Sequence, residues 1–355
     1  MTLVGSQSSA VRALAERVGA ALLLLSLFCL CVLSGCQGER VTTRLAGVTM
    51  GTAWHVSIVD IDSAQRIELQ EQIQQVLDAV NEAMSTYLPD SDLSRFNRAP
   101  VAECIKVTAH TWRVTKAAID VARQTGGAFN PGVATLVELW GFGANTPQQG
   151  VPQQHEIDDA RQKSQLSQLM LDQSQRALCK KGPITLDYSA IAKGYAVDEV
   201  AALLDRRGFE DYLVEVGGEV KTSGLNADRQ HWRIGIEKPQ LGRGVVLAAV
   251  SLSGDAVATS GDYRNYREVD GRRYSHTIDP VTGMPVMHQL ASVTVVMPSA
   301  MEADAYATAL NVMGPEKGLA FALQRALPVY MVVKSAEGFE ARHSPAFARY
   351  LQSTP

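Results

Sequence analysis

The sequence predicts an α+β protein in which mainly antiparallel sheets pack against helices. Short apolar segments occur in runs separated by short turns, as is typical of antiparallel strands. Between the runs lie longer segments whose apolar residues recur at helical spacing. Because the strands are grouped rather than strictly alternating with helices, the pattern favours α+β. Of the 355 residues, 46% are hydrophobic, which suits a folded body with a sizeable core.

The N-terminal segment has the features of an export signal. Arg12 and Arg17 precede an uncharged, mainly apolar run, Ala20–Leu33, which is shorter than the roughly 17–25 residues that a membrane-spanning helix needs. The next residues, Leu33-Ser34-Gly35-Cys36, resemble the bacterial lipobox, so we expect cleavage before Cys36 and attachment of lipid to it. An uncleaved anchor or a buried helix is the alternative. The predicted division is a signal peptide (1–35), a tether (36–46) and one domain (47–350).

Charge and cysteine content exclude several classes of protein. The net charge is -4 and no dense block of Lys and Arg occurs, which argues against nucleic acid as the partner. No Cys-x-x-Cys or His-x-x-x-His pattern is present, so neither a zinc site nor a thiol redox site is indicated. Only Cys104 and Cys179 remain in the mature body, and the sequence leaves open whether they pair.

The predicted elements follow from apolar spacing and from the residues that end each segment. Gly126-Gly127 and Gly208 are expected to end two of the helices, and Gly314-Pro315 should interrupt the last helical region. In chain order we predict a strand at Trp54–Val59, a helix from Leu69 to Met84, a helix at His110–Gln124, a helix at Ile191–Arg207, strands near Tyr212–Val216, Trp232–Ile236, Val245–Leu252 and Ser292–Met297, and a helical pair at Glu302–Met313 and Glu316–Arg325.

The segment Leu186–Asp198 is the first candidate for a functional site. We interpret it as a strand that enters a helix through a polar turn. The free N–H groups and positive dipole end of such a helix would suit a phosphate. Ordinary capping of the helix by Ser189 is the structural alternative.

A second candidate combines Ala258–Tyr266 with Tyr274–Pro285. Hydroxyl residues, a histidine and two acids lie there beside Gly and Pro turns, as in sites held on loops. His276 lies between two hydroxyl residues and three positions before Asp279, which favours a functional role over a structural one.

A third candidate lies in Ala303–Leu310. Asp304 and Thr308 are four residues apart and therefore share one helical face. A carboxylate and a hydroxyl are hard oxygen donors that suit Mg²⁺ together with waters and phosphate oxygens. A solvated helix face is the alternative for this segment alone.

Together these segments resemble the ApbE family of FAD:protein FMN transferases. The resemblance runs in order over nearly the whole mature chain. Its motifs are Met50-Gly51-Thr52, Met84-Ser85-Thr86-Tyr87, Ser94-Arg95-Phe96-Asn97, Gly127-Ala128-Phe129-Asn130-Pro131, Trp140-Gly141-Phe142-Gly143, Leu186 to Asp198, Val214 to Glu219, Ser275 to Pro280 and Ala303 to Leu310.

The resemblance implies an ApbE-like, T-fold-like body and a Mg²⁺-dependent reaction. FAD would be cleaved at its pyrophosphate, AMP would leave, and FMN would be joined to a threonine hydroxyl of an acceptor protein. It implies Mg²⁺ ligation by the side chains of Asp304 and Thr308, by the backbone carbonyl of Ala190 and by the backbone of Ala307. It also implies FAD contacts at Met50, Tyr87, Ala128, Phe129, Asn130, Asp187, Lys193 and Ile278.

The general base is expected to be His276, because imidazole titrates near neutral pH, with Asp279 or Asp187 as alternatives. Hydrolysis of FAD to FMN and AMP and simple flavin binding without catalysis are the competing functions. The resemblance implies acceptors that are flavin-carrying subunits of membrane redox complexes of the sodium-pumping quinone reductase (Nqr) and Rnf types. Cys36 would tether the chain on the periplasmic side of the cell envelope, at an inner or outer membrane that Gln37 does not specify.

Overall fold

The structure is a computed structural model that describes residues 39–143, 150–239, 245–261 and 265–351. The predicted signal peptide and Cys36 lie outside the described residues. In the part of the chain that the structure describes, none of the helices combines the length and apolar character needed to span a membrane. Part of the predicted tether, Thr42–Ala46, belongs to the first strand of the main sheet, so the folded body includes these residues.

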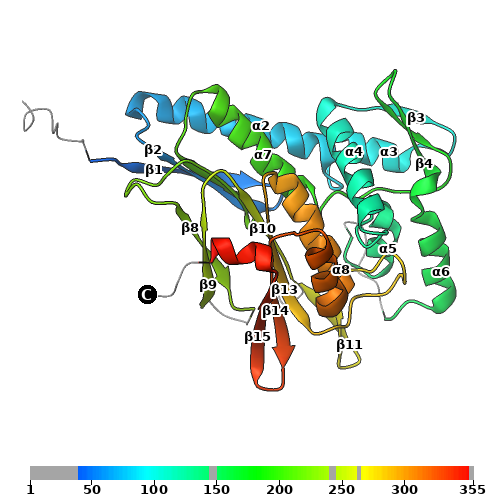
Figure 1. The fold of residues 1–355 in the computed structure, drawn as a ribbon. Coiled ribbons are helices and arrows are strands. Elements are labelled where there is room, and N and C mark those ends of the chain that lie inside the picture. Colours follow the sequence, from blue (N-terminus) through cyan, green and yellow to red (C-terminus); the bar gives the residue numbers. More distant parts are fainter. Residues whose placement is uncertain (1–38, 144–149, 240–244, 262–264, 352–355) are drawn as a thin grey trace, which may run out of the picture. The chain divides into compact units, whose positions relative to one another are not determined.

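The main sheet confirms the predicted α+β fold with antiparallel strands. It has eight strands in the order β1-β2-β6-β7-β10-β13-β14-β15, and every neighbouring pair is antiparallel (Figure 1). The strands are β1 Thr42–Thr49, β2 Thr52–Val59, β6 Tyr212–Val216, β7 Glu219–Ser223, β10 Ala256–Gly261, β13 Leu290–Met297, β14 Val329–Ser335 and β15 Gly338–His343.

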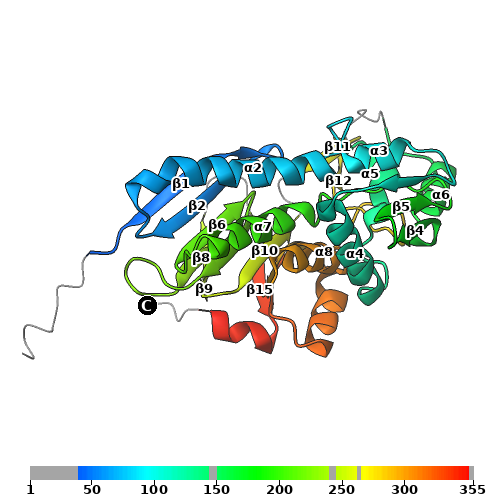
Figure 2. The ribbon, with the colours of Figure 1, turned by 90° about the horizontal axis from the view of Figure 1, so that it is seen from above.

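The two faces of this sheet are covered differently because side chains alternate along each strand. In β10, Ala256 and Ala258 join the core under the helices, whereas Val257 between them joins a smaller core on the opposite face. The helical layer contains α2 Arg66–Met84, α4 Ala109–Gln124, α7 Ala192–Arg206 and α8 Ala300–Gln324 (Figure 2). The opposite face is covered by β8 Trp232–Glu237, β9 Val246–Leu252 and the 3-10 helix Pro345–Tyr350.

Helices α7 and α8 cap each other. Asp198 of α7 accepts hydrogen bonds from the backbone N–H groups of Ala300 and Met301 in the first turn of α8, both at 3.0 Å. In return, Oδ2 of Asp304 in α8 accepts a hydrogen bond from the Gly194 N–H at the start of α7, also at 3.0 Å. The first N–H groups of a helix have no acceptor within that helix, and here each of the two helices supplies a carboxylate that accepts from the other.

Helix α8 contains the predicted interruption. Gly314 has φ 77° and ψ 179° inside the element, which separates it into two helical pieces before Pro315. A side chain at position 314 would also meet the ring of His288, because a Cβ there would lie 2.7 Å from His288 Cδ2. The local Gly-Pro signal therefore predicted this kink correctly.

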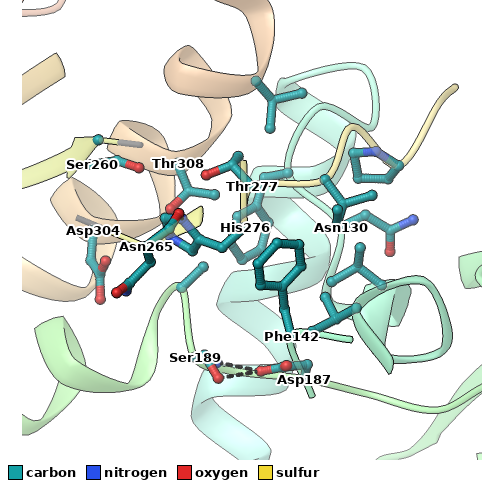
Figure 3. Close-up of a pocket in the computed structure, with 18 of the residues that line it drawn as sticks. Asn130, Phe142, Asp187, Ser189, Ser260, Asn265, His276, Thr277, Asp304 and Thr308 are labelled. Carbon is teal, nitrogen blue, oxygen red and sulfur yellow. Dashed lines mark hydrogen bonds between the residues drawn. The ribbon is translucent and has the colours of Figure 1, made fainter. Parts of the chain in front are cut away.

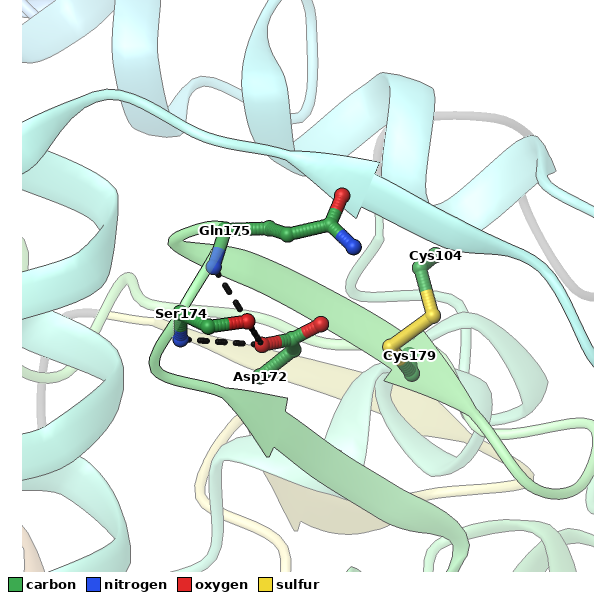
Figure 4. The surroundings of a disulfide bond; sticks show 5 residues. All are labelled: Cys104, Asp172, Ser174, Gln175 and Cys179. Atoms are coloured by element: carbon green, nitrogen blue, oxygen red, sulfur yellow. Dashed lines mark hydrogen bonds between the residues drawn. A yellow bond between two sulfur atoms is a disulfide. The ribbon is translucent and has the colours of Figure 1, made fainter.

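A smaller sheet lies beside the helical layer and contains the disulfide. Cys104 and Cys179 face each other in neighbouring antiparallel strands and are joined by a disulfide bond (Figure 4). The pairing that the sequence left open is therefore present. The remaining elements are β3 Cys104–Lys106, β4 Leu169–Asp172 and β5 Ala177–Lys180, the helices α3 Asp92–Arg98, α5 Ala134–Leu139 and α6 Gln154–Lys163, the hairpin β11 Tyr266–Val269 and β12 Arg272–Ser275, and the 3-10 helices η1 Ser63–Gln65, η2 Pro131–Val133 and η3 Leu166–Gln168.

Candidate active site

A cavity of about 710 Å³ lies where the helical layer meets the loops of the smaller elements. Its lining comes from the 128–142 segment, the turn before α7, the end of β10, the loop after β12, and α8. Figure 3 shows Asp304 and Thr308 projecting from α8 on one side of this cavity, with Asp187 and Ser189 on another. Three regions that the sequence singled out separately are thus brought together.

The wall formed by Ala128, Phe129 and Asn130 is held in place by the Asn130 side chain. Its Nδ2 donates to the Ser164 carbonyl at 3.1 Å, and its Oδ1 accepts from the Gly132 N–H at 2.8 Å. Ala128 and Phe129 are both buried. All three residues line the cavity, where a flat ligand could contact them.

The turn before α7 corrects one prediction. The stretch at Leu186 is not a strand, because the backbone N–H and C=O of Leu186 bond to the side-chain amide of Asn97 in α3 instead of to a neighbouring strand. The Asp187 N–H donates to the carbonyl of Pro131, which joins this turn to the opposite cavity wall. Ser189 does not cap α7. Its hydroxyl and its N–H both donate to Asp187 Oδ1, and the helix starts at Ala192 without a side-chain cap at Ile191.

The predicted metal ligands divide into two groups in the structure. Ala190, Asp304 and Thr308 line the cavity, whereas Ala307 is buried outside the lining. The described residues contain no cluster of three or more His, Cys, Asp or Glu side chains suited to a metal. One carboxylate, one hydroxyl and one backbone carbonyl are the oxygen ligands that Mg²⁺ accepts while it keeps several waters.

Glu219 is a site residue that sequence reasoning missed. It lines the same cavity from the start of β7, and its Oε1 accepts a hydrogen bond from Lys193 Nζ at 2.6 Å. Its Oε2 is buried without a hydrogen-bond partner. This unpaired carboxylate oxygen, close to Asp304, is a further oxygen donor that a divalent cation could use. The Gly217-Gly218-Glu219 turn was the available signal, since two positive-φ glycines hold the acid at the strand start.

The pKa values in this cluster reflect burial and mutual charge. Burial raises the pKa of Glu219, the charge of Asp304 raises it further, and Lys193 opposes both. Burial likewise raises the pKa of Asp304, against the charge of Lys193 and the Gly194 N–H. Burial alone would lower the pKa of Lys193, but the two carboxylates outweigh it and raise this pKa above its usual value.

His276 and Asp279 are placed very differently although they are three residues apart. His276 lines the cavity, and its Nδ1 lies 2.9 Å from the Asn265 carbonyl, which can only accept, so Nδ1 carries the proton. Asp279 is outside the lining. Its carboxylate accepts from the Val281 N–H and the Thr282 hydroxyl and so closes the following turn. Ile278 lines the cavity between them.

Met50 and Tyr87 line a second cavity, of about 550 Å³. Ser189 and Lys193 line both cavities, so the two adjoin at the start of α7. Met50 has φ 47° and Gly51 φ 72°, the two positive values of a type I′ hairpin turn between β1 and β2. A non-glycine residue in this region of backbone space carries strain, which favours a functional reason for Met50.

The fold and this two-part site define an α+β protein in which a cavity with carboxylate and hydroxyl groups adjoins a second cavity that contains Met50 and Tyr87. Residues 50–331 match the model of the ApbE family. The chain belongs to this family.

Relatives and solved structures agree over most of the chain. An FAD:protein FMN transferase of Vibrio cholerae serotype O1 is 42% identical over 330 residues, which cover 92% of this chain and 98% of the relative. The structure of the flavin transferase ApbE from Vibrio cholerae has a TM-score of 0.80, with 41% identity, and covers 88% of this chain and 100% of that one. The apo flavinyl transferase ApbE of Pseudomonas stutzeri has a TM-score of 0.83, with 37% identity, and covers 90% of this chain and 100% of that one.

Proposed function

We propose that this chain transfers FMN from FAD to a threonine hydroxyl of an acceptor protein and releases AMP. The observation that carries the proposal is the junction of two unlike cavities at Ser189 and Lys193. One cavity has the thioether of Met50 and the ring of Tyr87, which suit a flat flavin. The other has hydroxyls, carboxylates and Lys193, which suit a pyrophosphate with its counter-ions. The names of the relatives support the same reaction.

In this reaction the acceptor's hydroxyl oxygen attacks the phosphorus of the FMN half of FAD. A new phosphorus–oxygen bond forms, and the bond between that phosphorus and the bridging oxygen breaks, so that AMP leaves with that oxygen. The ammonium of Lys193, held by Glu219, lies where it can offset charge on the phosphate oxygens. Asp304, Thr308 and the carbonyl of Ala190 would hold Mg²⁺, which when bound neutralises charge on the phosphates and on AMP.

His276 is the group that would take the proton of the acceptor hydroxyl. Because Nδ1 donates to the Asn265 carbonyl, Nε2 is the ring nitrogen that would accept this proton. Asp279 does not enter the proposal, because its carboxylate is bound within its own turn, outside the cavity lining. Asp187 Oδ1 is likewise occupied by two bonds from Ser189.

The acceptor and the location are further parts of the proposal. We propose flavin-carrying subunits of membrane redox complexes of the Nqr and Rnf types as acceptors. A lipid on Cys36 would hold the enzyme on the periplasmic side of a membrane and raise the effective concentration of such acceptors. The lipobox-like sequence before Cys36 supports this part.

The test is to incubate the folded domain with FAD, Mg²⁺ and a threonine-bearing acceptor, and to measure acceptor mass and AMP together. The expected result is a mass gain equal to one FMN less one water on the acceptor, matched by one AMP released. An acceptor whose threonine is replaced by valine is the control and should gain nothing. AMP without a mass gain on several acceptors would identify an FAD hydrolase instead, and FAD binding with neither product would identify a flavin-binding protein.

A further inference from the structure

A buried amide lies behind the cavity on the face of α8 that carries Asp304 and Thr308. Asn311 follows Thr308 by three residues, so the two share this face. Its side chain has no exposed surface and is not part of the cavity lining. Its Nδ2 lies 3.3 Å from the hydroxyl of Ser260 and 3.3 Å from the hydroxyl of Thr277. The proposed reaction assigns no individual role to Asn311, Ser260 or Thr277.

Both hydroxyls line the cavity, although they come from different elements. Ser260 lies in β10, and Thr277 lies in the loop after β12. Figure 3 shows them on the side of the cavity where Thr308 lies, away from Asp187 and Ser189. Asn311 thus connects two hydroxyls that the sequence separates by seventeen positions.

The amide determines the direction in which these hydroxyls donate. The Nδ2 group has two N–H donors and no lone pair to accept with, and it gives one N–H to each hydroxyl oxygen. Each hydroxyl therefore acts as the acceptor toward Asn311, and its own proton must be directed elsewhere. Within the described residues Asn311 is the partner of both hydroxyls, so both protons are available to the cavity.

The orientation of the amide is itself informative. Asn311 Oδ1 is buried without a hydrogen-bond partner. With the amide reversed, the two N–H donors of Nδ2 would be buried without acceptors, which is the less favourable arrangement because orphaned buried N–H groups are rarer than orphaned oxygens. A buried polar atom without a partner costs free energy, so the arrangement calls for a reason beyond packing.

We propose that Asn311 is a positioning residue that makes Ser260 and Thr277 a pair of O–H donors for a phosphate oxygen of the substrate. The inference rests on the proposed function, because it names the part of the cavity that recognises the pyrophosphate of FAD. Two converging donors favour an oxygen with several lone pairs and a negative charge. Asn311 touches no substrate and acts through the two hydroxyls.

A purely structural role of Asn311 can be told apart from the proposed positioning role, because the structural contact of Asn311 is made by its backbone. The Asn311 carbonyl accepts a hydrogen bond from His288 Nε2 at 2.6 Å, close to the kink at Gly314. Substitution of the side chain leaves that carbonyl in place. A loss of ligand selectivity on substitution therefore reports on the amide and not on the kink.

The experiment compares the dissociation constants of FAD and of riboflavin, which lacks phosphate, by flavin fluorescence in the full domain. Asn311→Leu should weaken FAD roughly 10-fold, because the hydroxyl protons are no longer directed, and should leave riboflavin unchanged. The double variant Ser260→Ala/Thr277→Val should also weaken FAD selectively. Adding Asn311→Leu to that double variant should cause no further loss, as expected for groups that act as one unit.

Three outcomes would overturn the inference. These are an equal loss for FAD and riboflavin in Asn311→Leu, additive losses in the triple variant, or unchanged FAD binding in the hydroxyl double variant. If Asn311→Leu does not fold, the hydroxyl double variant alone still decides whether phosphate recognition uses these donors. If wild-type protein binds no FAD, the proposed function is wrong and this inference is wrong with it. If the wild-type protein transfers FMN but one of the first three outcomes is found, the proposed function stands and only this inference is wrong.

Discussion

The side chain of Asp304 accepts a hydrogen bond from the backbone N–H of Gly194, with 3.0 Å between Oδ2 and the nitrogen. The carboxylate that would hold the metal therefore also satisfies the start of α7, the helix that carries Lys193 into both cavities. Asp198 makes the reciprocal contact with the start of α8. The positions of the metal-binding and phosphate-binding groups are thus set by a pair of helices that depend on each other.

Replacing Asp198 by alanine should destabilise the protein by about 2 kcal/mol, because the N–H groups of Ala300 and Met301 in the first turn of α8 lose their acceptor. The Ser299 hydroxyl and the Lys221 ammonium lose the same partner. The measurement is the free energy of unfolding in urea. Asp159→Ala, which removes an exposed ion pair with Lys163, is the matched control and should change stability by less than about 1 kcal/mol. Equal effects of the two substitutions would contradict the capping role.

Asp304→Asn should remove Mg²⁺-dependent turnover while it preserves the fold. The amide oxygen of asparagine can still accept from the Gly194 N–H, but it offers the metal no charge. We expect AMP release to fall roughly 100-fold or more at saturating FAD, with a melting temperature close to that of the wild type. Turnover within a few-fold of wild type over a Mg²⁺ titration would show that Asp304 is not a ligand.

Stability of the metal-free protein should fall as pH rises above about 5. The pKa values of Glu219 and Asp304 are raised above their usual values of 4.5 and 3.8, so the folded state binds more protons than the unfolded state in this range. The slope of stability against pH is therefore negative. The raised pKa of Lys193 keeps its charge constant over the same range.

Urea unfolding with a chelator at about pH 5 and about pH 8 measures this slope, and Glu219→Gln should reduce it. Mg²⁺ should restore stability mainly at the higher pH, since it binds the ionised carboxylates. A stabilisation by Mg²⁺ that is independent of pH would contradict the involvement of these two acids.

His276→Ala should lower transfer while it spares FAD binding. Loss of a general base typically costs 10²–10⁴-fold in rate, so we expect a fall of about 100-fold or more. The Asn265 carbonyl loses its imidazole partner, but the backbone N–H of residue 276 also points to that carbonyl and remains. The measurement is single-turnover transfer beside the dissociation constant of FAD. Unchanged transfer would exclude His276 as the base.

Removing the disulfide with Cys104→Ser/Cys179→Ser should lower the free energy of unfolding by about 4 kcal/mol. The cross-link spans 75 residues, and the chain-entropy model assigns a loop of that length roughly this effect. Wild-type protein with and without reductant provides the comparison in urea. A loss below about 1 kcal/mol would show that the neighbouring strand pairing alone holds this sheet.

Local signals in the sequence predicted the elements that depend on local physics. The spacing of apolar residues gave α4 within one residue, and Gly314-Pro315 gave the kink in α8. The i,i+4 spacing placed Asp304 and Thr308 on one face, and both do line the cavity. In each case the signal and the structure involve residues within one or two helical turns.

Features that depend on distant residues could not be predicted in the same way. The stretch at Leu186 has the apolar character of a strand, but its partner is the side chain of Asn97, 89 residues away. The partner of Lys193 is Glu219, on a different element. The separation of Met50 and Tyr87 into a second cavity likewise depends on packing between β1, β2 and α2, which no motif specifies.

The disulfide determines what a protease can separate. The segment between Cys104 and Cys179 contains α4, α5 and α6 and the cavity wall Ala128–Asn130. A single cut inside that segment leaves both fragments covalently joined, so the nicked chain migrates as one species without reductant and as two with it. A cut outside the segment gives two species in either case. The wall of the cavity therefore belongs to a closed covalent ring that survives one break.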